Sequence, residues 1–276
     1  MIFMGDILVH EEKSSFYRIR VVEDEMHLYR KLYLDSQLAA GVSVETGENI
    51  LSYADYVSLI FLLAPKPSRV LVVGLGGGVL PLEFHRKTNA KIDVVEIDPK
   101  IVGVAKKFFG FLEDDRMKAH VCDGREFVEK SREKYDVIFM DAFNTTYGIP
   151  CHLTTVELFG ELKSHLSEDG FIVSNVISAL EGGKSSMFRA LYKTISQLFP
   201  TLYIFHSEED ACELQNIVII STTNRKLGKL ELFKRALKTP YAEFVTSYWE
   251  KDIALEDVPV LTDENCSIVE KLLGGN

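Results

Sequence analysis

The sequence contains little cysteine, and its cysteines form no metal-binding or redox motif. Four occur, widely separated along the chain, at Cys122, Cys151, Cys212 and Cys266. There is no Cys-x-x-Cys pair and no pair of neighbouring histidines that could complete a zinc site. Such sparse cysteines also make a poor disulfide framework and are typical of proteins from reducing compartments. We therefore predict neither a bound metal nor a disulfide-rich secreted domain.

Long hydrophobic runs are also missing. The longest apolar segment, near residues 56–64, is too short to cross a bilayer, and Pro65 and Pro67 interrupt its continuation. The first residues, MIFMGDILVHEEK, have neither a basic start nor a long apolar centre, so they do not match a secretory signal peptide. These features predict a cytoplasmic protein without a membrane partner.

The charge balance is acidic, and it disfavours a nucleic-acid partner. The 276 residues carry a formal net charge of −10, whereas a nucleic-acid-binding surface is usually basic. A cationic substrate would fit this charge, although many soluble proteins are simply acidic. Hydrophobic residues make up 46% and charged residues 26%, so the chain has an ordinary globular composition. Its length suits one large domain, alone or with a small appendage.

The stretch 69–98 organises the rest of the chain. An apolar run, Val70–Val73, has the composition of a strand buried on both faces. It leads into a helical segment through a turn that holds Gly74, Gly76, Gly77 and Gly78. A second apolar run, Ile92–Ile97, brings the acids Glu96 and Asp98. Glycines let a ligand approach the backbone, the helix start offers free N–H groups, and an acid can bind ribose hydroxyls. The stretch predicts a nucleoside or dinucleotide site.

After this stretch, strands alternate with helices. Further strands are predicted at Met117–Cys122, Tyr135–Met140, Phe171–Val176, Leu202–Phe205 and Ile217–Ser221. Helices are predicted at 52–64, 99–109, 125–133, 155–166, 185–199, 227–237 and 241–251, with a turn at 167–170 and a loose tail at the end. This alternation predicts an α/β, doubly wound parallel sheet with helices on both faces, in which an antiparallel last strand would be ordinary.

Residues 1–50 have a different pattern, with short alternating stretches and polar turns. Tyr17–Val22 and His27–Leu34 are predicted strands, and Val42–Glu45 is a third. We predict a small antiparallel β domain at 1–50, followed by a Rossmann-like nucleoside-binding catalytic domain at 51–276.

Four consecutive strands of the predicted sheet end in a polar signature. The ends are the glycine turn, Glu96 with Asp98, Asp123 with Gly124, and Asp141. Because the carboxyl ends of parallel strands face one crevice, we expect these groups around one cleft. Asp98 has a simpler interpretation as a helix cap, since Pro99 follows it. No Lys-Ser/Thr pair follows the glycines, so the turn is not a triphosphatase loop.

These motifs resemble the spermidine synthase (polyamine aminopropyltransferase) family. The similarity is carried by VLVVGLGGGVLPLEF, VVEIDPKIVGVAKKFF, DDRMKAHVCDGREFV and YDVIFMDAF, within residues 52–222. The family has a Rossmann-like fold of the S-adenosylmethionine methyltransferase type, preceded by a small β-sheet. The resemblance implies a transferase of polyamine biosynthesis. It would move an aminopropyl group from decarboxylated S-adenosylmethionine to a small-molecule amine, without a metal, and the family also pairs amino-terminal strands across a homodimer.

The resemblance also implies which residues contact the donor nucleoside. Glu96 would hold the ribose hydroxyls, and Asp123 would face the adenine amino group. The full implied donor set is Gln37, Gly74, Gly76, Gly78, Glu96, Ile97, Asp123 and Gly124.

On the acceptor side, Asp141 matches the family acid that binds the attacking amine, and Tyr53 matches a substrate-site tyrosine. The amine is cationic in water, and it must lose a proton before its lone pair can attack the carbon beside the sulfonium. A carboxylate can orient the amine and take part in removing that proton. It also offsets the positive charge of the bound substrates. His152 is a second candidate for proton transfer, although a solvated loop histidine is the simpler interpretation.

Two departures from the family pattern bear on the reaction. Gly76 stands where the family's glycine turn usually has an aspartate, and a glycine would tolerate the carboxylate of intact S-adenosylmethionine. The loop DAFNTTYGIPCHLTT lacks the family's second acid and its proline, and Asn144 lies nearby. This loop and the tail VPVLTDENCSIVEKLL resemble a divergent spermidine-synthase-like branch. Aminopropyl transfer is favoured, and the alternatives are methyl transfer from S-adenosylmethionine to a small molecule and nucleoside binding without catalysis.

Overall fold

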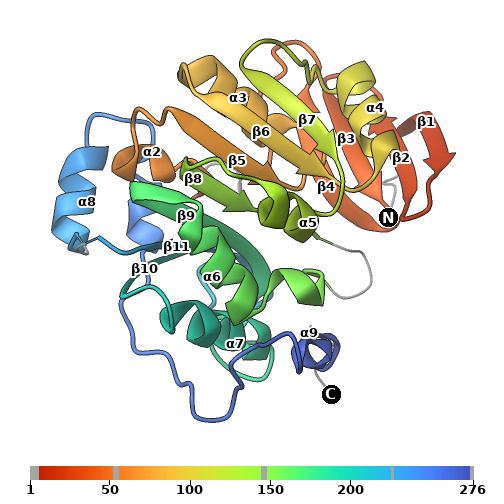
Figure 1. Ribbon diagram of the computed structural model, residues 1–276. Helices are drawn as coiled ribbons and strands as arrows, with labels where there is room; N and C mark the ends of the chain where they lie inside the picture. Colours follow the sequence, from red (N-terminus) through yellow and green to blue (C-terminus); the bar gives the residue numbers. More distant parts are fainter. Residues whose placement is uncertain (1–5, 52–55, 144–147, 225–226, 274–276) are drawn as a thin grey trace.

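Two β-sheets organise the computed structural model, which describes residues 6–51, 56–143, 148–224 and 227–273 (Figure 1). A four-stranded sheet near the amino terminus lies beside a seven-stranded sheet that carries the rest of the chain. The smaller sheet contains β1 (Ile7–Lys13), β2 (Arg18–Glu23), β3 (Tyr29–Leu34) and β4 (Gln37–Ser43). Each of these strands is antiparallel to the next, as predicted.

The fourth strand begins earlier than the sequence pattern indicates. A strand was expected at Val42–Glu45, but β4 ends at Ser43. The reason is the tight turn at Asp35, whose φ of 51° lets Leu34 pair directly with Gln37. The turn therefore starts β4 immediately after β3 and places Gln37 at its first position.

The seven-stranded sheet has the predicted doubly wound arrangement. Its strands are β5 (Arg69–Val73), β6 (Lys91–Glu96), β7 (Met117–Val121), β8 (Tyr135–Met140), β9 (Leu166–Ser178), β10 (Thr201–His206) and β11 (Gln215–Thr222). Their order is β10-β11-β9-β8-β5-β6-β7, and the pairs from β9 to β7 are parallel. The last strand, β11, is antiparallel to both of its neighbours. The predicted fold class is confirmed.

Helices cover both faces of this sheet (Figure 1). They are α2 (Ile60–Leu63), α3 (Val79–Lys87), α4 (Pro99–Phe108), α5 (Gly124–Lys130), α6 (Val156–Ser164), α7 (Ser186–Ser196), α8 (Lys229–Ala236) and α9 (Val269–Leu273). Short 3-10 turns accompany them at η1 (Cys151–Leu153), η2 (Phe244–Ser247) and η3 (Cys266–Ile268). Among the helices described here, none combines the length and apolarity that a bilayer crossing requires.

Three sequence predictions in the second half of the chain are wrong. The residues expected to form a turn at 167–170 lie within β9, as an irregularity of the ladder between Leu166, which pairs with Tyr135 of β8, and Phe171, which pairs with Val137. The helix expected at 241–251 is reduced to η2, because Tyr248 forms a β-bridge with Phe205. The tail is not loose, since it contains η3 and α9.

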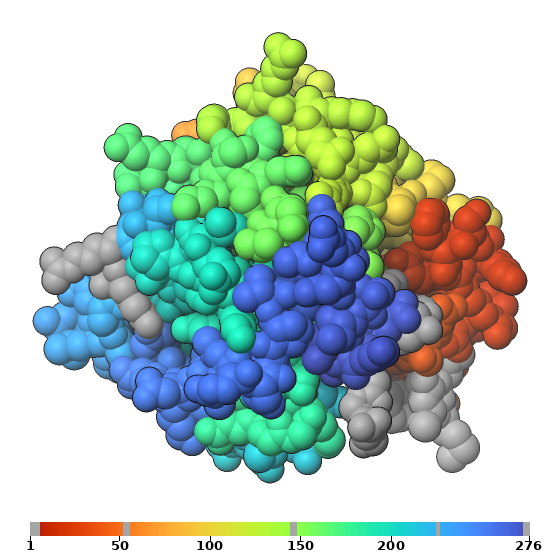
Figure 2. Space-filling model, turned by 60° about the horizontal axis from the view of Figure 1, so that its bottom comes forward, coloured from red at the N-terminus to blue at the C-terminus, as the bar shows by residue number. Residues whose placement is uncertain are grey.

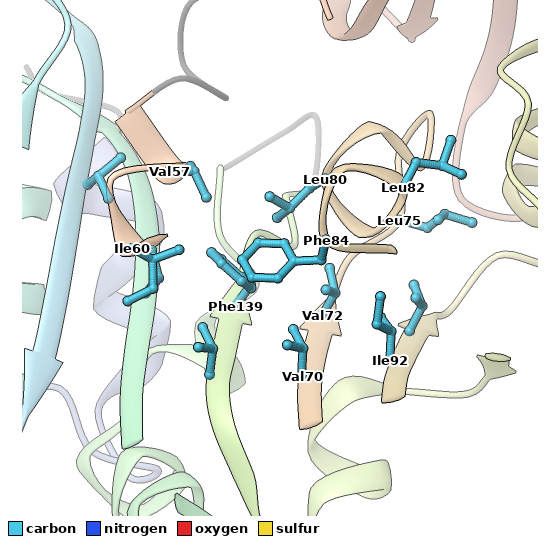
Figure 3. Packing of buried hydrophobic residues seen from close by; sticks show 14 of the residues in the cluster. Val57, Ile60, Val70, Val72, Leu75, Leu80, Leu82, Phe84, Ile92 and Phe139 are labelled. Atoms are coloured by element: carbon cyan, nitrogen blue, oxygen red, sulfur yellow. The ribbon is translucent and has the colours of Figure 1, made fainter. Parts of the chain in front are cut away.

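Alternate residues of the central strands pack into two hydrophobic clusters, one on each face of the sheet. Figure 3 shows the first, in which Val70 and Val72 lie near Phe84 and Phe139. The two phenylalanine rings meet edge to face, with centroids 5.1 Å apart. The same cluster includes buried residues of the amino-terminal sheet, among them Ile19. The small sheet therefore packs against the elements on either side of the glycine turn, β5 and α3. The division of the chain into domains at 1–50 and 51–276 stays a proposal.

Candidate functional site

A cavity of about 450 Å³ lies where the carboxyl ends of β5, β6, β7 and β8 meet. The small sheet supplies the opposite wall through residues of β4, including Leu38 and Ala40. Cavities of this size hold nucleoside-sized ligands in other proteins. The position is the crevice at which an open α/β sheet binds its ligand.

The structure brings most of the predicted site residues to this cavity. Those that line it are Gln37, Gly74, Gly76, Glu96, Ile97, Asp123, Gly124 and Asp141. Tyr53 lies outside the described residues. Gly78 is not part of the lining. It begins α3 with a φ of 76°, and a Cβ there would lie 2.9 Å from the Phe111 side chain. Packing against Phe111 accounts for this glycine, and its contact with the donor stays a prediction.

Gly74 allows two strand ends to approach each other. Its φ is 99°, and a Cβ at this position would lie 2.4 Å from the backbone oxygen of Asp141. The Gly74 N–H donates to the carbonyl of Val95, and the Asp141 N–H donates to that of Val73, both at 2.9 Å. Only glycine tolerates this conformation and this contact together. The glycine turn and the Asp141 backbone are therefore held side by side.

Glu96 links the glycine turn to the start of α4. One carboxylate oxygen accepts from the Leu75 N–H at 3.0 Å, and the other accepts from the Asp98 N–H at 2.9 Å. Burial raises the pKa of Glu96, and these backbone hydrogen bonds oppose the rise. Asp98 itself accepts from the Lys100 N–H at 3.0 Å, which confirms its interpretation as a helix cap.

Asp123 serves two neighbours. One oxygen caps α5 by accepting from the backbone N–H groups of Arg125, at 2.9 Å, and Glu126, at 3.2 Å. The other oxygen lies 2.9 Å from Nε2 of His152 in η1. His152 also lines the cavity. The His152 side chain is 42% exposed, and the fold also gives it a carboxylate partner at the cavity wall.

Asp141 is held by a side chain that the sequence reasoning missed. Its Oδ1 accepts from Nδ2 of Asn175 at 3.1 Å, across the neighbouring strands β8 and β9. Burial raises the pKa of Asp141 to about 6, although the hydrogen bond from Asn175 lowers it. Asn175 is itself buried, and its Oδ1 has no partner in the described structure. The available signal was a lone amide within the apolar run Phe171–Val176.

Tyr17 is a second residue that the sequence reasoning did not place at the site. It lines the cavity, and its hydroxyl donates to the backbone oxygen of Phe143 at 3.0 Å. Burial, together with the nearby carboxylates of Glu96 and Asp98, raises the pKa of Tyr17 to about 12. The phenol therefore stays protonated and remains a donor. It fixes the backbone just beyond Asp141 to the amino-terminal sheet.

The described cavity lining is acidic. It contains the carboxylates of Glu96, Asp123 and Asp141, and no lysine or arginine occurs among its described residues. Fixed negative charges in a partly enclosed cavity favour cationic ligands over anionic ones. The arrangement suits a positively charged sulfonium or an amine, and its glycine turn suits a nucleoside.

Comparisons with known proteins point in the same direction. A family model described as the spermine/spermidine synthase domain matches residues 53–222. A polyamine aminopropyltransferase from Vibrio vulnificus is 33% identical over 201 residues, which cover 67% of this chain and 65% of that protein. The chain thus matches slightly less than two thirds of that relative's length.

Two solved structures have a similar fold. A probable spermidine synthase from Corynebacterium glutamicum aligns with a TM-score of 0.71 at 13% identity, covering 91% of this chain and 98% of the other. Human methyltransferase-like protein 13, solved in complex with SAH, aligns with a TM-score of 0.55 at 29% identity, covering 76% and 96%. The same fold therefore occurs in proteins named for two different transfer reactions.

Proposed function

Because the chain belongs to the spermine/spermidine synthase family, we propose that it is a transferase that moves an aminopropyl group. The donor is decarboxylated S-adenosylmethionine, and the acceptor is a small-molecule amine. The observation that carries the proposal is the grouping of Glu96, Asp123 and Asp141 around one cavity without a described cationic side chain. The donor is a cation, and so is the acceptor before it reacts.

In this proposal the donor nucleoside lies along the glycine turn. Glu96 accepts the ribose hydroxyls with the lone pairs that its two backbone hydrogen bonds leave free. Asp123 accepts from the adenine amino group, and His152 holds its second oxygen. Gln37 and Ile97 complete the nucleoside contacts from β4 and from the residue after β6.

Asp141 acts on the acceptor. The carboxylate orients the ammonium group and takes part in removing its proton. The free amine nitrogen then attacks the methylene carbon bonded to the sulfonium, the carbon–sulfur bond breaks, and neutral methylthioadenosine leaves. Asn175 keeps the carboxylate in place through its hydrogen bond to Oδ1. The cavity supplies the alignment of nucleophile, carbon and leaving sulfur.

A second candidate is methyl transfer from intact S-adenosylmethionine, and Gly76 favours it. A Cβ on Gly76 would meet only the backbone oxygen of Ala39, at 3.6 Å, so there is open space beside the turn. Because Gly76 has no carboxylate, nothing at this position repels the carboxylate of the intact donor. The similar human protein is named methyltransferase-like protein 13, and its structure was solved in complex with SAH.

Product analysis separates the two candidates. The protein is incubated with either donor and a panel of diamines and polyamines, and the products are identified by mass spectrometry. Aminopropyl transfer is expected to release methylthioadenosine and to add one aminopropyl group to the amine. SAH and a methylated amine would instead establish the second candidate. Binding of neither donor, measured by calorimetry, would exclude both reactions.

The pH profile is expected to depend on Asp141. Its carboxyl group has a pKa of about 6, so it is ionised above that pH and protonated below it. Only the ionised form can accept a proton. The slope of log(kcat/KM) against pH should therefore be steeper by one unit below about pH 6 than it is above that pH. The profile is measured with the acceptor that product analysis identifies.

Asn175→Leu provides a test of this assignment. The hydrogen bond from Asn175 lowers the pKa of Asp141, so its loss should move the acidic break to higher pH. The acidic break in the pH profile is also measured on the residual activity of Asp141→Asn. If the break stays near pH 6 in both variants, it belongs to the titration of another group.

A further inference from the structure

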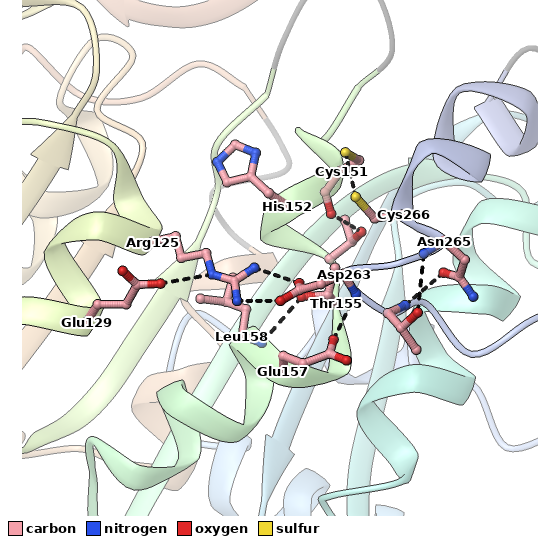
Figure 4. Close-up of polar contacts among 12 residues, drawn as sticks. Arg125, Glu129, Cys151, His152, Thr155, Glu157, Leu158, Asp263, Asn265 and Cys266 are labelled. Carbon is pink, nitrogen blue, oxygen red and sulfur yellow. Dashed lines mark hydrogen bonds and ion pairs between the residues drawn. The ribbon is translucent and has the colours of Figure 1, made fainter.

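Two cysteines that are distant in the sequence lie in contact in the fold. Cys151 begins η1, Cys266 begins η3, and their Sγ atoms are 2.8 Å apart (Figure 4). Both thiols are free and half-buried. A disulfide has a sulfur–sulfur distance of about 2.05 Å, so a small movement would allow the bond to form. The sequence separation concealed this pair.

The contact joins the carboxyl-terminal segment, defined here as residues 258–272, to the cavity wall. Pro150, His152 and Leu153 line the cavity on either side of Cys151. Cys266 belongs to the carboxyl-terminal segment, which lies on the surface in dark blue in Figure 2. A bond between the two sulfurs would therefore fasten the segment to the cavity wall.

Other contacts already hold the segment in position, independently of the cysteines. Asp263 accepts two hydrogen bonds from the guanidinium of Arg125, each at 2.6 Å (Figure 4). Its backbone N–H donates to Glu157 at 3.0 Å. The Leu261 N–H donates to Oγ1 of Thr194 at 2.8 Å. The segment is thus docked on α5, α6 and α7, and the thiols meet without help from a covalent bond.

We propose that Cys151 and Cys266 are a reversible redox pair whose disulfide locks the carboxyl-terminal segment onto the cavity wall. The inference rests on the sulfur contact and on the docking of the segment. It does not depend on which group the enzyme transfers.

The local chemistry sets the order of the reaction with a peroxide. The Cys266 thiol donates to the Cys151 sulfur. Burial, with the hydrogen bond to Cys151, raises the pKa of Cys266 to about 11, so this thiol stays protonated at neutral pH. The hydrogen bond that Cys266 donates to the Cys151 sulfur assigns Cys151 as the attacking sulfur. It takes one peroxide oxygen to become a sulfenic acid and releases one water. Cys266 condenses with the sulfenic acid, a second water leaves, and the disulfide forms.

The test treats the reduced protein with hydrogen peroxide and maps its peptides without reduction. A Cys151–Cys266 cross-link is expected, with a loss of two free thiols per chain. The thermal midpoint should rise by about 5 °C, because the bond closes a loop of more than a hundred residues in the unfolded chain. Dithiothreitol should reverse both effects.

Serine variants identify the pair. Cys151→Ser and Cys266→Ser should each abolish the cross-link and the thermal shift, whereas Cys212→Ser, at an exposed position, should behave like the unmodified sequence. The proposal is overturned if peroxide converts Cys151 to higher oxides without a cross-link. It is equally overturned if the cross-link joins two chains, or if Cys266→Ser keeps the full thermal shift.

Discussion

Replacing Asp141 by Asn is expected to reduce turnover roughly 10³-fold while leaving the binding of methylthioadenosine within two-fold of its original strength. Asparagine has the same shape, and its carbonyl oxygen can still accept the hydrogen bond that Asn175 donates. It cannot take the proton of the amine, however, and it removes a negative charge beside the cationic substrates. The chemical step should therefore fail while the nucleoside site persists.

Initial rates and calorimetric titrations measure these two effects separately. Asp169→Asn is the matched control, because Asp169 is exposed in β9 and does not line the cavity. Turnover that survives undiminished in Asp141→Asn would remove the role assigned to this residue. A combined loss of turnover, nucleoside binding and thermal stability would instead indicate that Asp141 only supports the fold around Gly74.

The second large effect is expected at Glu96. Glu96→Gln should weaken methylthioadenosine binding about 10- to 100-fold. The two carboxylate oxygens accept backbone N–H groups from Leu75 and Asp98, and a glutamine can offer an oxygen to only one of them. Its amide NH₂ group would face the other donor, which would displace the glycine turn. The ribose would also lose a charged acceptor.

Calorimetry with methylthioadenosine tests this effect without any acceptor amine. Glu168→Gln, at an exposed position of β9, is the control for the same chemical change. Binding by Glu96→Gln within two-fold of the original strength would rule out the ribose contact. Comparison with Asp141→Asn then separates the donor site from the acceptor site, since only Glu96→Gln is expected to impair nucleoside binding.

The sequence was most informative where the relevant interactions are local. The apolar run of β5, the glycine turn and α3 follow one another directly, so composition and spacing predicted them. The cap at Asp98 could also be predicted, because a cap side chain accepts from a backbone N–H group no more than three residues along the chain, here that of Lys100. Parallel strands place their carboxyl ends together, and this rule brought Glu96, Asp123 and Asp141 to one cleft.

Predictions failed where a lateral neighbour overrides the local pattern. The sequence at 167–170 has the composition of a turn, yet these residues lie within β9 as an irregularity of the ladder, because the residues on both sides of them pair with β8. The packing of Phe111 at the place where a Gly78 side chain would lie is likewise not visible in the local spacing. Neither partner can be identified from the residues adjacent in the chain.

The sequence by itself therefore determined the order of strands and helices, the glycine turn and the acids at successive strand ends. Only the tertiary structure decided which side chains flank those acids. Asn175 reaches Asp141 because β9 lies next to β8, and Tyr17 reaches the backbone beyond Asp141 because the small sheet packs over the turn. Cys151 and Cys266 meet because the carboxyl-terminal segment docks beside η1. Such contacts depend on the packing of whole elements, since the buried apolar surface that drives it is shared among residues far apart in the chain.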